Sequence, residues 1–189
     1  MRSRRFLLAA SLAALAALAF GALGCTPASE PKPGGEDGGA AAAEPKEARA
    51  APDFELSTLA GETVRLAELR GKTVVIDFWA TWCPPCEFQV PELNAFWEAH
   101  QADGDVEVLG ISVDVEGQEV VGAWATEKDI RYKVLLGGED LARKFGAVGF
   151  PTLYVIDPAG HVDSEHVGLI EVADLEEALA KQRGRSGSS

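Results

Sequence analysis

The sequence has few cysteines, a deficit of positive charge and no glycine-rich phosphate loop, and each shortage excludes a class of protein. Three cysteines in 189 residues are too few for a disulfide-stapled scaffold or a four-thiolate zinc site. A formal net charge of -13 would repel a phosphate backbone, which argues against nucleic acid as a partner. Without a phosphate-binding glycine loop, nothing indicates a nicotinamide, flavin or nucleotide site.

Long apolar runs are also scarce, and the one that occurs lies at the N-terminus. Three arginines within residues 2–5 precede eighteen uncharged residues over 6–23, the pattern of an export signal. The run ends in Ala22-Leu23-Gly24-Cys25, which resembles the lipobox of bacterial lipoproteins, where the cysteine is lipidated. We therefore expect residues 1–25 to be a lipoprotein-type signal peptide ending at Cys25. An uncleaved membrane helix and a chance cysteine are the alternatives.

The next segment cannot form a core. Residues 26–51 contain no aromatic residue and no valine, leucine or isoleucine, so they bury too little apolar surface to offset the entropy of ordering. We expect them to form a disordered tether, and residues 184–189 a flexible tail. Residues 52–183 are then the folded domain.

Within that domain, strand-like and helix-like periodicities alternate. The continuously apolar, β-branched run 73–79 predicts a strand buried on both faces. The other predicted strands are 106–113 and a hairpin formed by 152–156 and 161–167. One helix is predicted to begin after Cys86 and to kink at Pro91. Three further helices are predicted over 120–128, 139–145 and 172–182. An extra hairpin is expected over 54–57 and 63–66. This order predicts an α/β fold with a central mixed β-sheet flanked by helices and an extra N-terminal β-hairpin.

Two cysteines three residues apart follow the first buried strand, in the run Trp79-Ala80-Thr81-Trp82-Cys83-Pro84-Pro85-Cys86. At a helix start this spacing brings both sulfurs within bridging distance. The helix dipole and free amides stabilise a thiolate there, and the thiolate is the nucleophile. We expect a solvent-facing Cys83 to attack a disulfide and a covered Cys86 to resolve the mixed disulfide.

The two residues between the cysteines bear on the direction of exchange. Pro84 and Pro85 have no N–H, so the Cys86 amide is the main local donor for the Cys83 sulfur. Stabilisation of the thiolate should then be modest. This predicts a mildly acidic Cys83 and a reducing, rather than strongly oxidising, pair.

Metal binding is an alternative reading of the same cysteines. Cys83, Cys86, His161 and His166 satisfy C-x-x-C with H-x4-H, but the two pairs lie much further apart than in compact zinc fingers. A copper carrier would use the two sulfurs and one histidine. We interpret the histidines as exposed hairpin residues and assign no metal.

The run from Phe78 to Cys86, together with the later Gly149-Phe150-Pro151-Thr152, resembles a thioredoxin-fold protein, most closely the membrane-anchored TlpA and ResA type, over residues 52–183. The resemblance implies that Pro151 is a cis proline facing the dithiol. It also implies that Phe150 offers its backbone to a bound substrate chain. Trp82 and Thr152 complete the expected substrate-binding residues.

The same resemblance assigns roles to two positions near the cysteines. Asp77, an acid in an otherwise apolar strand, matches the acid that assists proton transfer in thioredoxin, so we expect it to accept the proton of Cys86. ResA-like proteins often carry a glutamate three residues after the second cysteine, where this chain has Gln89, which removes one titrating group. We expect Glu87 and Glu92 to be solvated. Trp97 and Trp124 should be core residues, and Trp82 should be the exposed tryptophan.

These observations predict an extracytoplasmic, lipid-anchored thiol-disulfide oxidoreductase without a cofactor beyond its own redox-active disulfide. Its substrates would be disulfide-containing exported proteins, with apocytochrome c implied by the resemblance, and a membrane thiol reductant would regenerate the dithiol. A thiol peroxidase of the peroxiredoxin type is the alternative enzyme. A peroxiredoxin would carry a proline and a Thr or Ser ahead of its reactive cysteine, where this chain has Trp79 and Ala80.

Overall fold

A computed structural model describes residues 49–186 of the chain. The expected signal peptide, its Cys25 and nearly all of the expected tether lie outside the described residues. Within residues 49–186, no helix combines the length and the apolar character needed to cross a membrane.

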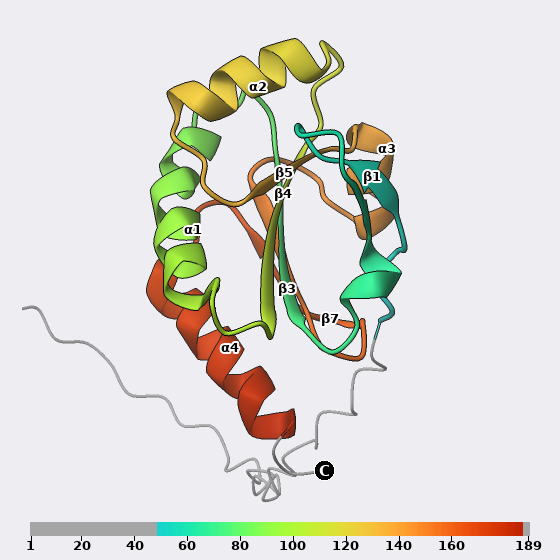
Figure 1. The fold of residues 1–189 in the computed structure, drawn as a ribbon, viewed down its shortest axis with the longest axis vertical. Coiled ribbons are helices and arrows are strands. Elements are labelled where there is room, and N and C mark those ends of the chain that lie inside the picture. Colours follow the sequence, from blue (N-terminus) through green and yellow to red (C-terminus); the bar gives the residue numbers. More distant parts are fainter. Residues whose placement is uncertain (1–48, 187–189) are drawn as a thin grey trace, which may run out of the picture. The chain divides into compact units, whose positions relative to one another are not determined.

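A five-stranded mixed sheet forms the centre of the fold (Figure 1), in the order β5-β4-β3-β6-β7. Its strands are β3 (Thr73–Trp79), β4 (Val106–Ser112), β5 (Lys133–Leu136), β6 (Thr152–Ile156) and β7 (Val162–Val167). β4 is parallel to both β3 and β5, whereas β6 is antiparallel to β3 and β7. The predicted mixed sheet is confirmed.

The small hairpin predicted at the N-terminal end is also confirmed. β1 (Glu55–Ser57) and β2 (Thr63–Arg65) pair antiparallel, with Leu56 opposite Val64. The short 3-10 helix η1 (Leu66–Leu69) follows and buries Leu66 completely. The hairpin lies against the sheet at its β5 edge, where Thr58 bridges Leu135.

β3 is the central strand of the sheet, and all seven of its side chains are buried. Successive strand residues point to opposite faces, so Val74, Ile76 and Phe78 enter one core cluster and Val75 enters the other. Hydrogen-bonded neighbours on both sides leave β3 no solvent-facing edge. Its continuous apolar run is therefore the signature of a strand covered on both faces.

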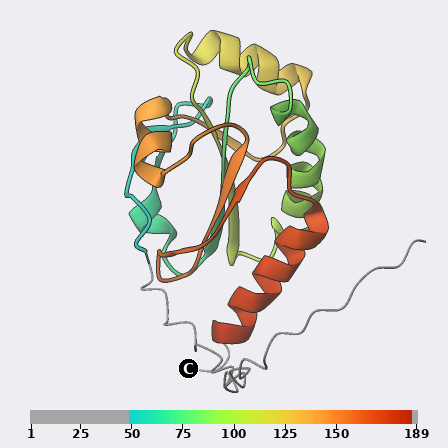
Figure 2. The ribbon, with the colours of Figure 1, turned by 180° about the vertical axis from the view of Figure 1, so that it is seen from behind.

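Helices cover both faces of the sheet, as the two opposite views show (Figures 1 and 2). α1 (Cys86–His100) and α4 (Val172–Ser186) pack on one face, where Leu93 and Phe96 meet Leu175 and Leu179. The hairpin, η1 and α3 (Glu139–Phe145) cover the other face. α2 (Gln118–Glu127) contributes Val121 and Ala125 to that second cluster.

The helix boundaries follow local chemistry. α3 ends where predicted, because Gly146 adopts a left-handed conformation with φ 95° that residues with a side chain rarely take. α1 continues as a single helix through Pro91, the position of the predicted kink. α2 begins two residues earlier than predicted, at Gln118, directly after Gly117 with its φ of 87°.

The described fold extends a few residues beyond the predicted domain, 52–183, at both ends. The fold includes residues 49–51, because Arg49 donates to the Phe145 carbonyl at 2.8 Å and Ala50 bridges His161. At the other end, α4 continues to Ser186 instead of giving way to a flexible tail at 184. The Arg185 side chain anchors this last turn on Asp163, with an N–O distance of 2.6 Å.

Gly110 provides a test of the packing behind the sheet. An added Cβ would lie 2.8 Å from Tyr132 Cε2 and 2.9 Å from Trp79 Nε1, and both side chains are buried. Gly110→Ala should therefore lower the free energy of unfolding in urea by about 1–3 kcal/mol. Gly122→Ala is the control, because its Cβ would meet Leu59 Cδ2 at 3.9 Å and alanine favours the α2 helix. Equal stability of the two variants would contradict this packing.

Candidate active site

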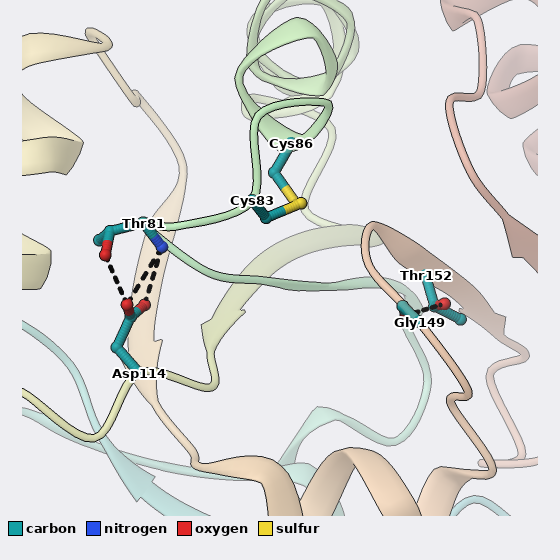
Figure 3. Close-up of a disulfide and its surroundings, with 6 residues drawn as sticks. All are labelled: Thr81, Cys83, Cys86, Asp114, Gly149 and Thr152. Atoms are coloured by element: carbon teal, nitrogen blue, oxygen red, sulfur yellow. Dashed lines mark hydrogen bonds between the residues drawn. A yellow bond between two sulfur atoms is a disulfide. The ribbon is translucent and has the colours of Figure 1, made fainter.

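Cys83 and Cys86 form a disulfide at the junction of β3 and α1 (Figure 3), with their Cα atoms 5.4 Å apart. Cys86 is the first residue of α1, and Cys83 lies in the loop that leaves β3. The parallel strand β4 ends beside this junction, since Trp79 pairs with Ser112. The predicted redox pair therefore stands at the carboxyl edge of two parallel strands, the edge where α/β proteins place their sites.

The exposure of the two cysteines differs from the prediction. Cys86 is 1% exposed, as expected, but Cys83 is only 5% exposed and does not face solvent in the disulfide form. The reason is packing: Cys83 belongs to the same core cluster as Trp79, Ala80 and Cys86. The exposed group at this place is the neighbouring Trp82, 55% exposed, which confirms the expectation for that tryptophan.

Backbone donors around Cys83 are fewer than expected. The Cys86 N–H, which we had assigned to the Cys83 sulfur, donates to the Cys83 carbonyl at 3.0 Å. Pro84 and Pro85 have no N–H to offer. Pro84, Pro85 and Cys86 therefore have no free amide N–H in this disulfide form that could stabilise a Cys83 thiolate after reduction. The expected modest acidity of Cys83 stays a prediction.

Asp114 holds the loop that precedes Cys83 (Figure 3). Its carboxylate accepts hydrogen bonds from the Thr81 amide at 3.0 and 3.1 Å, from the Thr81 hydroxyl at 2.5 Å and from the Ser112 hydroxyl at 2.7 Å. Sequence reasoning missed Asp114. Its position just after β4, at the carboxyl edge shared with β3, was the available signal.

The second loop of the site contains a cis peptide bond between Phe150 and Pro151, as the resemblance implied. The Pro151 carbonyl accepts a hydrogen bond from the Gly168 amide at 2.9 Å. The rings of Phe150 and Trp82 meet edge to face at 5.9 Å between centroids, so the loop bearing Pro151 and the cysteine loop touch. Two of the predicted substrate-binding residues are therefore adjacent.

Thr152, the third predicted substrate-binding residue, is placed differently. Its side chain is fully buried, and its hydroxyl donates to the Gly149 carbonyl at 2.7 Å (Figure 3). Because the Thr152 side chain is buried and its hydroxyl is already bonded to Gly149, it stabilises the loop and is not accessible to a substrate.

Asp77 lies in the middle of β3, paired in register with Gly110 and Leu153, and is 1% exposed. By strand alternation it points to the same face as Val75, which α1 covers. Its Oδ1 has no hydrogen-bond partner among the described residues, and burial raises the pKa of the carboxyl well above its ordinary value. Its role as proton acceptor for Cys86, the first residue of α1, stays a prediction.

The contacts and burial of four nearby residues correct their predicted environments. Glu92 is not simply solvated, because its Oε2 accepts from the Val172 amide at the start of α4, at 2.8 Å. Glu87 pairs with Lys128 at 2.8 Å. Trp97 and Trp124 are half-buried at the borders of the two core clusters instead of fully inside them.

His161 and His166 contact residues close to them in the β6–β7 region. His166 Nε2 hydrogen-bonds to the Leu169 carbonyl at 2.7 Å, and His161 lies 3.5 Å from the Asp157 carboxylate. Both are partly rather than fully exposed. Across residues 49–186, no group of three or more His, Cys, Asp or Glu side chains is arranged to hold a metal ion.

Comparisons with known proteins match this arrangement. Residues 48–165 match the AhpC/TSA family. The thiol-disulfide oxidoreductase ResA of Geobacillus thermodenitrificans (strain NG80-2) is 34% identical over 130 residues, covering 68% of this chain and 74% of ResA. The thioredoxin-like protein YneN of Bacillus subtilis (strain 168) is 29% identical over 134 residues, covering 71% and 79%.

A solved structure extends the likeness to three dimensions. The crystal structure of a thiol:disulfide interchange protein of the thioredoxin family from Chlorobium tepidum TLS superposes with a TM-score of 0.63 at 30% identity. The match covers 71% of this chain and 96% of that one. The predicted thioredoxin fold is thus confirmed, with the N-terminal hairpin as its addition.

Asp77 gives a prediction with a defined sign. A carboxyl whose pKa is raised by folding binds a proton more tightly in the folded state, so its contribution to stability falls as pH rises above the ordinary value of 3.8. In the disulfide form, Asp77→Asn should therefore be more stable than the wild type at pH 7, and this gain should vanish toward pH 3. Urea unfolding across pH 3–8 measures it, and a pH-independent difference between the two proteins would contradict the assignment.

Asp114 gives a second prediction. Asp114→Ala leaves the partly buried Thr81 amide and the hydroxyl of the buried Ser112 without their acceptor, so the free energy of unfolding should fall by about 1–3 kcal/mol. Glu116→Ala, two residues further along and exposed, should stay within about 0.5 kcal/mol of the wild type. If the two substitutions have the same effect, Asp114 does not hold the cysteine loop.

Proposed function

This chain belongs to the AhpC/TSA family and is a thiol-disulfide oxidoreductase of the ResA type, and we propose that it reduces disulfide bonds in exported proteins. The observation that carries the proposal is the Cys83–Cys86 disulfide at the head of α1, next to the loop with cis Pro151. In its reduced, dithiol form, that pair supplies two electrons without any cofactor.

The reaction follows from the placement of the two sulfurs. In the reduced protein, the Cys83 thiolate attacks one sulfur of a substrate disulfide, forming a mixed disulfide and releasing the other substrate sulfur as a thiolate that takes up a proton. The Cys86 thiol then loses its proton, for which Asp77 is the proposed acceptor, and attacks Cys83. The substrate leaves as a dithiol, and the Cys83–Cys86 disulfide carries the two electrons' worth of oxidation.

The direction of exchange rests on the donors around Cys83. A strongly oxidising pair requires a heavily stabilised thiolate, because that stabilises the reduced form. Pro84 and Pro85 offer no N–H, and the Cys86 amide is bonded to the Cys83 carbonyl. We therefore assign a weakly stabilised thiolate and a reducing role.

The substrate and the setting are inferred from the sequence. The run over residues 6–23 would direct export, and a lipid on Cys25 would hold the domain at the outer side of a membrane through the segment up to residue 48. A thiol protein in that membrane would return electrons to the disulfide. Apocytochrome c is the proposed substrate class, and the exposed Trp82 beside Phe150 provides an aromatic surface for its chain.

Capture of the mixed disulfide tests this function. In a Cys25→Ser background, Cys86→Ser should accumulate a covalent complex with a disulfide-bonded protein, detected by intact mass, because no second thiol resolves it. A C-x-x-C-H peptide oxidised to its disulfide tests the proposed substrate class in the same assay.

Cys83→Ser in the same background is the matched control and should capture nothing, since Cys86 is 1% exposed. Equal capture by both variants would refute the assigned roles. Consumption of hydrogen peroxide by the Cys86→Ser variant, without capture of disulfides, would support the peroxiredoxin-type alternative instead.

A further inference from the structure

Gln89 connects the cysteine helix to a segment far away in the sequence. It lies one turn after Cys86 in α1 and is 1% exposed. Its Nε2 donates to the Ile170 carbonyl at 3.0 Å, and its Oε1 accepts from the Ile170 amide at 2.9 Å. Both ends of one buried side-chain amide are therefore bonded to both backbone groups of a single residue.

The segment that Gln89 holds also contacts the cis-proline loop. Residues 168–170 join β7 to α4, and the Gly168 amide donates to the Pro151 carbonyl at 2.9 Å. The Leu169 carbonyl between them accepts from His166. A continuous path of hydrogen bonds and three backbone residues thus runs from α1, one turn below the disulfide, to Pro151.

We propose that Gln89 is a positioning residue that sets the place of the Pro151 loop relative to the Cys83–Cys86 pair. In this proposal Gln89 acts through residues 168–170 and does not contact the substrate disulfide. The inference rests on the proposed function, because the Pro151 loop matters only if a substrate chain binds beside the cysteines. Loss of the Gln89 contacts would displace the loop that a protein substrate meets.

The chemistry of the amide explains why this position requires glutamine. The Ile170 backbone presents one donor, its N–H, and one acceptor, its carbonyl. Only a side chain with both an acceptor and a donor can hydrogen-bond to the two groups. Leucine offers neither, and an ionised glutamate offers acceptors alone and would face the Ile170 carbonyl. A protonated glutamate has one donor and one acceptor, so it can replace the amide, but only at low pH.

The elements around Gln89 carry other ionisable groups, and all of them stay unchanged in the variants. They include Asp77 in β3, Glu87 and Glu92 in α1, His166 in β7, Glu171 in the connecting segment, and Asp174 and Glu176 at the start of α4. A pH effect found only in Gln89→Glu is therefore due to the introduced carboxyl.

The test compares two substrates for each variant of the full chain. A disulfide-bonded protein must dock beside the Pro151 loop, whereas a small aromatic disulfide needs only access to Cys83. Gln89→Leu should lower kcat/KM for the protein disulfide about 10-fold, because misplacement of a docking loop by a fraction of an ångström acts on a positioned chain. Its rate with the small disulfide should stay within about 2-fold of the wild type, since that reaction depends on the thiol alone.

Gln89→Glu adds a readout that a purely structural role would not produce. Its ratio of protein to small-disulfide rates should equal the wild-type ratio near pH 5 and fall about 10-fold by pH 8, as the introduced carboxyl ionises. Gln101→Leu and Gln101→Glu, at the exposed far end of α1, are the matched controls and should keep the wild-type ratio at every pH.

The outcomes separate this inference from the proposed function. A wild-type protein that reduces neither disulfide overturns the proposed function. An active wild type whose ratio is unchanged in Gln89→Leu, or in Gln89→Glu at pH 8, overturns the inference. Should Gln89→Leu fail to fold, the pH series of Gln89→Glu decides alone, because that variant keeps both hydrogen bonds at low pH.

Discussion

Burial of β3 on both faces is the constraint from which the rest of this structure follows. Seven consecutive buried side chains hold β3 between β4 and β6. The chain then leaves the sheet at the carboxyl end of β3. That exit places Cys83 against the core and lets α1 begin at Cys86. The same strand carries Asp77, and burial there raises the pKa of its carboxyl well above the ordinary value.

Around this strand, segments that are distant in sequence contact the residues next to the two cysteines. Asp114 fixes the loop before Cys83, and the Phe150 ring touches Trp82 from the loop with the cis peptide bond. Gln89 reaches from α1 to Ile170. Side-chain contacts thus fix the loop before Cys83, the residue beside Cys83 and the helix that begins at Cys86, while the chemistry itself needs only two sulfurs and a proton acceptor.

Most regular elements could be predicted because each is encoded locally, although β5 and η1 were not among the predicted elements. The apolar run of β3, the left-handed Gly146 after α3 and the C-x-x-C spacing are all visible within a few residues. The hydrogen bonds of Asp114 and Gln89 could not be predicted in this way, because they join residues 33 and 81 positions apart. The burial of Cys83 and the turn that uses the Cys86 amide depend on the folded loop, so local pattern could not report them either.

The fold extends past residues 52 and 183 for a related reason. Composition correctly marks Arg49 and Arg185 as polar residues of low core potential, but each is held by a distant partner, Phe145 or Asp163. An ion pair or a hydrogen bond to a remote carbonyl can extend a fold beyond its apolar residues. Composition alone therefore placed the edges of the domain a few residues too far inward.

The central claim is that Cys83 and Cys86 form a reducing dithiol, and its midpoint potential tests that claim most directly. Equilibration of the protein in glutathione or dithiothreitol buffers, with the two thiols counted by mass, gives this potential. The account predicts one two-electron transition nearer to the value of thioredoxin, about -270 mV, than to that of a strong oxidant, about -120 mV. A transition above about -150 mV, or separate one-electron events at the two cysteines, would contradict it.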